Sequence, residues 1–150
     1  MKVFILLFVV GFVAAEYKIK HFDDLMHYHD ECATEHNIPA DTLAKYKKQK
    51  YEDDHQTHCH IHCVAKKLGV FDDEHGMAID NYVAQVVAAN HETEEVVRPK
   101  IVHCAEEVEQ YKADHCLWAF KGFFCTKAAG YEVIERKHRK GGHKKHDHDH

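Results

Sequence analysis

The sequence predicts an all-α fold, a compact bundle of about six helices around an apolar cavity, stapled by three disulfides. Along most of the chain apolar residues recur at steps of three and four, as on one face of a helix. No stretch alternates as a strand does, so we expect no sheet. Proline and glycine are scarce, at two and seven of 150 residues, and six cysteines in a small secreted chain are typical of three disulfides.

The N-terminus has the composition of a secretory signal peptide. Lys2 supplies a basic start, an apolar run follows it, and Ala14 and Ala15 end the run with small side chains. A membrane span needs about 20 apolar residues, and this run is shorter. We therefore expect residues 1–15 to be cleaved, which leaves one secreted helical domain over residues 16–135.

The C-terminal residues 136–150 are rich in histidine, lysine, glycine and aspartate and contain no apolar side chain, which predicts a disordered tail. The whole chain carries a formal net charge of −5, and the acidic excess lies in the helical domain. An acidic domain argues against nucleic acid as a partner. Beyond the signal segment no stretch approaches the length that stable membrane insertion requires.

The first two helices are predicted over residues 20–36 and 39–48. In the first, Phe22 and Leu25 belong to a set that recurs at three- and four-residue steps. Pro39 suits the first turn of the second helix, where a backbone N–H is not needed.

The next two helices flank a loop. The aspartates at 53–54 are candidate N-caps for a helix that ends near Leu68, with Gly69 as its stop. A loop is expected over residues 70–76. The helix predicted over residues 79–89 has the clearest amphipathic pattern in the chain.

The last two helices complete the bundle. One is capped by Thr93 and runs to about Tyr111, with Pro99 either starting or kinking it. The other follows the N-cap Asp114. Because residues 116–125 include a single charged side chain, we expect this helix to be buried nearly all round.

Cys59 and Cys63 lie four residues apart on the helix that ends near Leu68. Positions with this spacing have Cβ atoms about 5–6 Å apart, whereas a disulfide requires about 3.8 Å. The two cysteines are therefore poor partners for each other, and their helix is placed to be tied to two other elements. The spacing within this helix does not choose among the remaining pairings.

The six cysteines follow the pattern C-x26-C-x3-C-x40-C-x11-C-x8-C. This pattern resembles the six-cysteine signature of insect odorant-binding proteins, the pheromone and general odorant-binding family, especially in the x3 and x8 intervals. The resemblance covers residues 17–134. It implies that the first cysteine pairs with the third, the second with the fifth and the fourth with the sixth: Cys32–Cys63, Cys59–Cys116 and Cys104–Cys125.

By the same resemblance, the protein is a secreted carrier of small hydrophobic ligands such as odorants, pheromones, fatty acids or similar lipids. It would transport them through an aqueous extracellular fluid, such as sensillar lymph or haemolymph, in olfaction or a related role. A chemosensory receptor is then an expected partner, and the carrier is expected to be a monomer or weak dimer. A carrier fold with an interaction role and no ligand is an alternative.

A stapled helical shell can hold a ligand cavity, and such pockets are largely apolar. The candidate ligand contacts are apolar side chains on helix faces: Phe22, Leu25, Met26, Leu68, Phe71, Tyr82, Val83, Val86, Trp118, Phe120, Phe123 and Phe124. The resemblance implies that residues after the sixth cysteine close the pocket. Three apolar residues have the position for this role: Tyr131, Val133 and Ile134.

Seventeen histidines support a different hypothesis, an extracellular histidine-rich metal-binding protein. Asp54, His58 and His62 share a helix face and offer two or three ligands for zinc or copper, but no fourth is evident. The tail offers a flexible histidine tract: His143, His146, His148 and His150. A further hypothesis is that protonation of clustered histidines loosens the fold as the pH falls, with four candidates: His29, His36, His62 and His103.

No enzyme motif is present. The chain contains no serine, no His-Glu-x-x-His, no glycine-rich phosphate loop and no Cys-x-x-Cys. Three disulfides, as expected above, would occupy all six cysteines. We therefore expect neither a catalytic residue nor a cofactor, and no dedicated metal site in the carrier.

Overall fold

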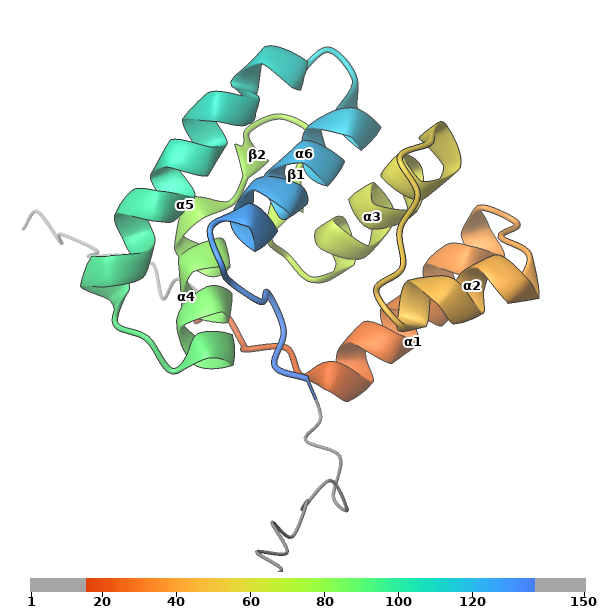
Figure 1. The fold of residues 1–150 in the computed structure, drawn as a ribbon, viewed down its shortest axis with the longest axis horizontal. Coiled ribbons are helices and arrows are strands. Elements are labelled where there is room, and N and C mark those ends of the chain that lie inside the picture. Colours follow the sequence, from red (N-terminus) through yellow and green to blue (C-terminus); the bar gives the residue numbers. More distant parts are fainter. Residues whose placement is uncertain (1–15, 137–150) are drawn as a thin grey trace, which may run out of the picture.

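The computed structural model describes residues 16–136, which form a bundle of six α-helices (Figure 1). The signal peptide predicted at residues 1–15 and the tail residues 137–150 lie outside the described residues. The predicted all-α class and the order of the helices are confirmed. In chain order the elements are α1 (Phe22–Glu35), α2 (Ala40–Lys47), α3 (His55–Lys67), β1 (Phe71–Asp72), β2 (Gly76–Met77), α4 (Ile79–Asn90), α5 (Glu94–Val108), the short 3-10 helix η1 (Glu109–Tyr111) and α6 (His115–Ala128).

Two helices begin where the sequence places a capping aspartate. The Asp54 carboxylate accepts a hydrogen bond from the backbone N–H of Thr57 at 2.8 Å, and α3 starts at the next residue. Asp114 caps α6 in the same way. By contrast, Pro99 lies inside α5 and does not start it. The helix begins instead after Thr93, more than one turn earlier than a proline start would place it.

The expectation of no sheet is wrong at one place, where β1 and β2 form a two-stranded antiparallel hairpin. Its strands have two residues each, which is too short for an alternating pattern to be visible in the sequence. The turn is held by Asp72, whose Oδ1 accepts hydrogen bonds from the backbone N–H groups of Glu74 and His75. Gly76 then adopts a φ of +79°, with the Trp118 indole against its Cα.

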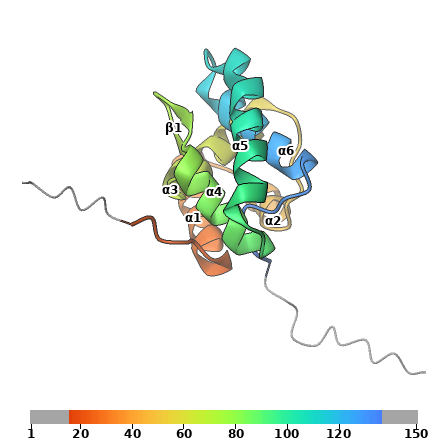
Figure 2. The ribbon, with the colours of Figure 1, turned by 90° about the vertical axis from the view of Figure 1, so that its left-hand side faces the viewer.

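Helices α3 and α6 pack against each other at the centre of the bundle. Figure 1 shows α1 and α2 beyond α3 on one side, and α4 and α5 on the other side of α6. The view in Figure 2 shows α5 lying alongside α6, which agrees with their packing contacts. The main core is therefore shared by α3, α4, α5 and α6, together with the hairpin and the segment after α6.

Three disulfides hold this arrangement: Cys32–Cys63, Cys59–Cys116 and Cys104–Cys125. They tie α3 to α1 and to α6, and α5 to α6. The pairing is the one that the family resemblance implies. Cys59 and Cys63 reach two different helices, as their spacing on one helix face predicts.

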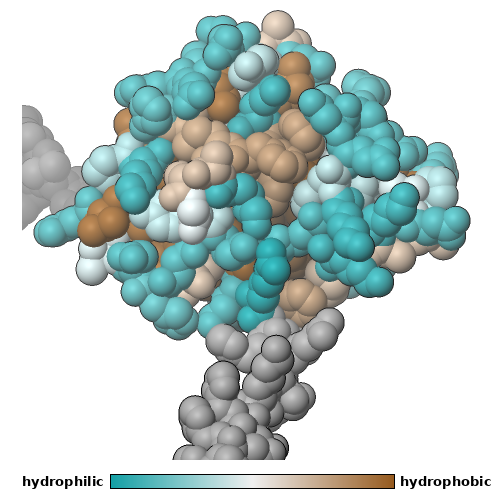
Figure 3. Space-filling model, in the orientation of Figure 1, coloured by the Kyte–Doolittle hydropathy of each residue, from teal (hydrophilic) through white to brown (hydrophobic). Residues whose placement is uncertain are grey.

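The expectation that α6 is buried nearly all round is wrong. Phe124 is 37% exposed, and Leu117 and Phe123 are only partly buried. The reason is that α6 packs against α3 and α5 and leaves a further face at the molecular surface. Figure 3 shows apolar side chains gathered on this face of the molecule, over the region of α6.

Candidate ligand-binding site

An apolar cavity lies among α1, α3, α4 and α6 and is closed by the segment that follows α6. The space open to the centre of a water-sized sphere is about 50 Å³, and the total empty volume, including the part open to solvent, is about 650 Å³. Seventeen residues line it: Leu25, His29, Gln49, Tyr51, Ile61, Val64, Ala65, Leu68, Val70, Phe71, Met77, Tyr82, Ala119, Phe123, Glu132, Val133 and Ile134.

One face of α3 forms the longest continuous wall. Its lining residues follow the steps three, one and three, which a helix of 3.6 residues per turn brings onto one side: Ile61, Val64, Ala65 and Leu68. Helix α6 adds Ala119 and Phe123, four residues apart on its inner side. The disulfide between Cys59 and Cys116 links these two helices, so it also holds two walls of the cavity together.

The residues after α6, 129–136, form a final segment that covers the cavity between α4 and α1 (Figure 1). Val133 and Ile134 line the cavity from this side. Asn90 at the end of α4 holds the segment in place, because its amide Nδ2 donates to the backbone carbonyl of Glu132 at 2.7 Å and its Oδ1 accepts from the Glu132 N–H at 3.0 Å. This pair of bonds fixes the segment much as a strand partner would.

A polar network closes the same side of the cavity. Lys127 of α6 contacts both carboxylate oxygens of Glu132 at 2.9 Å and donates to the side-chain oxygen of Gln49 at 3.2 Å. Arg136 donates to the same two side chains. The network therefore joins the α2–α3 loop, α6 and the final segment, and it neutralises the carboxylate of Glu132.

Two buried histidines face each other next to the cavity. His29 of α1 and His60 of α3 are 1% and 0% exposed, and Nδ1 of His29 lies 2.8 Å from Nε2 of His60. Burial lowers the pKa of His29 to about 4 and the pKa of His60 to about 3, so both rings are neutral in the fold. Within residues 16–136, Nε2 of His29 and Nδ1 of His60 have no hydrogen-bond partner.

Two tyrosines add hydroxyl groups to the wall. Tyr82 of α4 is almost fully buried, and burial raises its pKa to about 12, so its hydroxyl stays protonated. Tyr51, in the α2–α3 loop, packs edge-on against Phe123 with ring centroids 5.7 Å apart. Burial also raises the pKa of Tyr51. The polar groups of the cavity are thus few and, apart from Glu132, uncharged.

Of the candidate contacts named from the sequence, seven line the cavity: Leu25, Leu68, Phe71, Tyr82, Phe123, Val133 and Ile134. The structure places eight others outside its lining: Phe22, Met26, Val83, Val86, Trp118, Phe120, Phe124 and Tyr131. All of them except Tyr131, which follows α6, lie on helices as expected, but most of them pack against protein.

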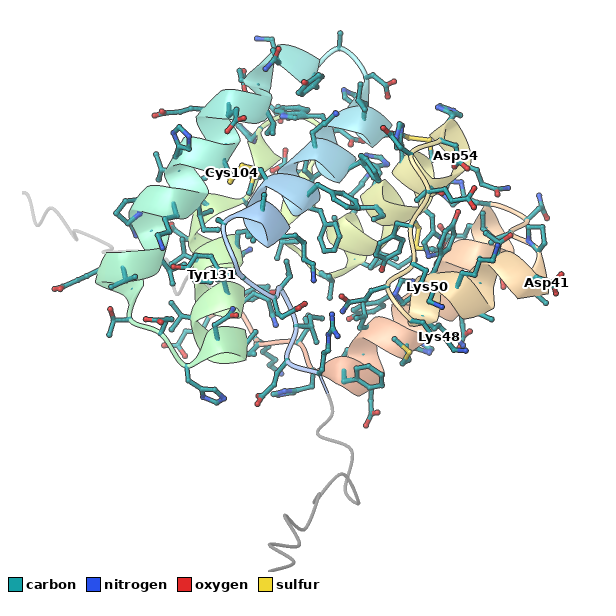
Figure 4. All side chains as sticks on the ribbon, in the orientation of Figure 1. Asp41, Lys48, Lys50, Asp54, Cys104 and Tyr131 are labelled. Atoms are coloured by element: carbon teal, nitrogen blue, oxygen red, sulfur yellow. A yellow bond between two sulfur atoms is a disulfide. The ribbon has the colours of Figure 1, made fainter. Side chains whose placement is uncertain are left out.

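Seven of these eight residues, all except Met26, have identifiable surroundings. Val83 and Val86 are fully buried in the core. Trp118 packs edge-on against Phe71, and Phe120 packs between His58 and Phe124. Tyr131 points from the final segment toward α5, where the ammonium of Lys100 lies 5.1 Å from its ring centre (Figure 4). Phe22 packs at the edge of the core.

Several lining residues were not predicted. Most of the lining residues on α3 had a sequence signal, because they belong to a set at helical spacing: residues 57, 60, 61, 64 and 68. The same signal places His60 on the buried face. Gln49, Tyr51 and Glu132 carry no such signal, because loops are positioned by tertiary contacts rather than by a repeating pattern.

The three residues proposed as metal ligands on α3 each make a different contact with the protein instead. Asp54 caps α3, His58 pairs with Asp53 at 2.6 Å, and His62 pairs with Asp73 at 2.5 Å. Across residues 16–136, the one group of three possible ligand atoms within 4.8 Å of one another is Cys32, Glu35 and Cys63, and both sulfurs belong to a disulfide. The four tail histidines lie outside the described residues.

Six helices, three disulfides and an internal apolar cavity define a disulfide-stapled helical binding protein. The family model described as the PBP/GOBP family matches residues 14–129, and the chain belongs to this family. The resemblance seen in the cysteine spacing is thereby confirmed.

Individual relatives agree with this assignment. The chain is 37% identical over 141 residues to "Odorant-binding protein 22" of Aedes aegypti, and the match covers 93% of this chain and 99% of that protein. It is 35% identical over 137 residues to "General odorant-binding protein 99a" of Drosophila melanogaster, with 91% and 96% covered. The crystal structure of the odorant-binding protein 22a of Anopheles gambiae superposes with a TM-score of 0.55 at 23% identity, covers 67% of this chain and 94% of that one, and supports the fold alone.

The described part of the chain, residues 16–136, contains no helix that is long and apolar enough to cross a membrane.

Proposed function

We propose that this protein is a secreted carrier that binds small hydrophobic ligands in the cavity beneath the final segment and transports them through aqueous extracellular fluid. The observation that carries the proposal is the apolar cavity itself, built between helices that disulfides hold together. Binding requires no covalent step, so no catalytic residue is assigned.

The chemistry of the ligand follows from the lining. Burial of apolar surface contributes about 25 cal/mol per Å² before the costs of association. The few polar groups of the wall would orient the ligand. Relatives named as odorant-binding proteins support odorants as the ligand class, and the apolar lining also suits pheromones, fatty acids or similar lipids.

The setting and partners belong to the same proposal. A signal peptide at residues 1–15 and three disulfides fit secretion into an oxidising fluid such as sensillar lymph or haemolymph. A chemosensory receptor is the proposed recipient of the ligand, and the carrier is proposed to act as a monomer or weak dimer.

Titration with an apolar fluorescent probe, N-phenylnaphthylamine, tests the proposal. We expect saturable binding that fatty acids and aliphatic alcohols displace. The variant Ala65→Phe fills the cavity from α3 and should weaken probe binding by about tenfold or more. Ala128→Phe, at an exposed position of α6, is the matched control and should bind as the wild type does.

Absence of saturable binding would refute the carrier function. Equal probe affinity of Ala65→Phe and the wild type would place the binding site elsewhere. Mass spectrometry of the protein purified from its natural source would identify a co-purifying lipid or odorant.

A further inference from the structure

His29, one of the residues of the cavity wall, carries a buried ring nitrogen that no group within residues 16–136 satisfies. Its Nδ1 is taken by Nε2 of His60, and its own Nε2 is buried and has no partner within the part of the chain that the structure describes. His29 is also one of the residues that line the cavity. A buried polar atom without a hydrogen bond is costly, and native structures rarely leave one unless water or a ligand supplies the partner.

The two histidines can share their hydrogen bond in two ways. If Nδ1 of His29 carries the proton, it donates to His60, and Nε2 of His29 is then a bare acceptor. If Nε2 of His60 carries the proton, it donates to His29, and Nε2 of His29 is then a donor. A ligand that satisfies His29 in both arrangements must be able to donate and to accept.

The surrounding charges argue against an anionic head group at this position. Both imidazoles are neutral, so neither offers a positive charge to a carboxylate. The one charged lining residue is Glu132, and its cationic neighbours Lys127 and Arg136 are already bonded to it. Lys47, whose charge acts on His29, is already paired with Asp30 at 2.6 Å. A ligand carboxylate beside His29 would therefore be a buried charge without a free counter-ion, which is unfavourable.

We propose that the cavity selects apolar molecules that bear an uncharged hydroxyl group, and that this hydroxyl forms a hydrogen bond with Nε2 of His29. The inference rests on the proposed function, because it assigns a ligand class to the same cavity. A hydroxyl group donates and accepts, and so it matches either arrangement of the histidine pair. Aldehydes, ketones and esters accept a hydrogen bond but cannot donate one, so they satisfy His29 only when its Nε2 carries the proton.

Three ligands of equal chain length separate the possibilities: heptanol, chloroheptane and heptanoate. Each is used to displace N-phenylnaphthylamine from the wild type at neutral pH. We expect heptanol to bind about fivefold to tenfold more tightly than chloroheptane, as one added hydrogen bond allows. Heptanoate should bind more weakly than heptanol.

The variant His29→Phe retains an aromatic ring but removes both ring nitrogens. We expect the ratio of heptanol affinity to chloroheptane affinity, measured within this variant, to fall to about one, whatever the absolute affinities become. His36→Phe is the matched control, since His36 lies on the exposed end of α1 and does not line the cavity, and it should keep the preference for heptanol.

Nitrogen NMR of the wild type provides a second measurement that needs no variant. Heptanol should shift the Nε2 resonance of His29, and chloroheptane should not. If the probe binds but heptanol shows no preference, if heptanoate binds more tightly, or if the Nε2 resonance does not respond to heptanol, the inference is wrong. If the probe does not bind at all, the proposed function fails, and the inference fails with it.

Discussion

Gly76 shows how a single residue fixes the position of the hairpin beside the cavity. A Cβ atom at this position would collide with the Trp118 ring, and the φ of +79° is unfavourable for any other residue type. Gly130 also has a positive φ, of +91°, but open space surrounds its Cα. Substitutions at these two positions can therefore separate the effect of a steric collision from the effect of backbone strain.

We expect Gly76→Ala to lower the free energy of unfolding by about 2–4 kcal/mol, because strain and overpacking add. Gly130→Ala should lower it by about 1 kcal/mol, from strain alone. Urea denaturation followed by far-ultraviolet circular dichroism measures both values. Equal losses in the two variants would show that Trp118 adjusts to the added methyl group.

The histidine pair predicts how stability depends on pH. In the fold the pKa of each ring lies well below its ordinary value because of burial, and for His29 the positive charge of Lys47 lowers it further while Asp30 opposes. For His60 the neighbours His29 and His36 act in the same direction as burial. The unfolded chain therefore binds protons in a range of pH where the folded chain does not.

This difference makes the protein lose stability on acidification. The contribution is fully present above the ordinary histidine pKa of about 6.5 and is lost as the pH falls from there toward 4. The slope is up to about 1.4 kcal/mol per histidine for each pH unit. Urea denaturation at neutral pH and at about pH 5 should show the loss, and the double variant His29→Phe with His60→Phe should show a smaller one. An unchanged slope in that variant would assign the effect to other groups.

At the scale of elements, the final segment is held over the cavity by Asn90. A second asparagine of the same helix, Asn81, donates to the backbone carbonyl of Gly69 at 2.8 Å and does not contact the segment. Both asparagine side chains thus bond to the backbone of another element, but of the two Asn90 alone bonds to the final segment.

We expect Asn90→Ala to release the segment over residues 131–134, since two hydrogen bonds to Glu132 are lost at about 1 kcal/mol each. Amide hydrogen exchange in this segment should become faster, and dissociation of N-phenylnaphthylamine should accelerate. Asn81→Ala should leave both rates near those of the wild type. Equal exchange rates in the two variants would show that the network of Lys127 is sufficient to hold the segment.

The elements also show what the sequence can and cannot predict. Helical periodicity predicts six helices, and the caps Asp54 and Asp114 give the starts of α3 and α6, because these signals are local. Without such a cap, the predicted start of α1 is two residues before the observed one. The hairpin escapes prediction, because its two-residue strands are too short to show alternation and because the contact of Gly76 with Trp118 of α6 has no local sequence signal. In the same way, periodicity identifies apolar helix faces but does not separate core from cavity. Val86 and Leu68 both lie on apolar helix faces and both belong to the core, yet Leu68 lines the cavity and Val86 does not.

At the scale of the whole molecule, the disulfides differ in what they hold. Cys59–Cys116 spans 57 residues and joins α3 to α6, which are two walls of the cavity. Cys104–Cys125 spans 21 residues and joins α5 to α6, and no residue of α5 lines the cavity. The two bonds therefore provide a matched comparison of global stability and site geometry.

Each bond can be removed by substituting both of its cysteines with alanine. The free energy of unfolding should fall by about 4 kcal/mol without Cys59–Cys116 and by about 3 kcal/mol without Cys104–Cys125. The first loss is larger because opening the longer loop gives the unfolded chain more entropy. Probe affinity should fall further for the first pair than for the second, since only the first holds cavity walls together. Urea denaturation and probe titration in native conditions measure the two effects separately. Equal loss of affinity in both variants would mean that the cavity depends on the stability of the whole bundle rather than on the link between α3 and α6.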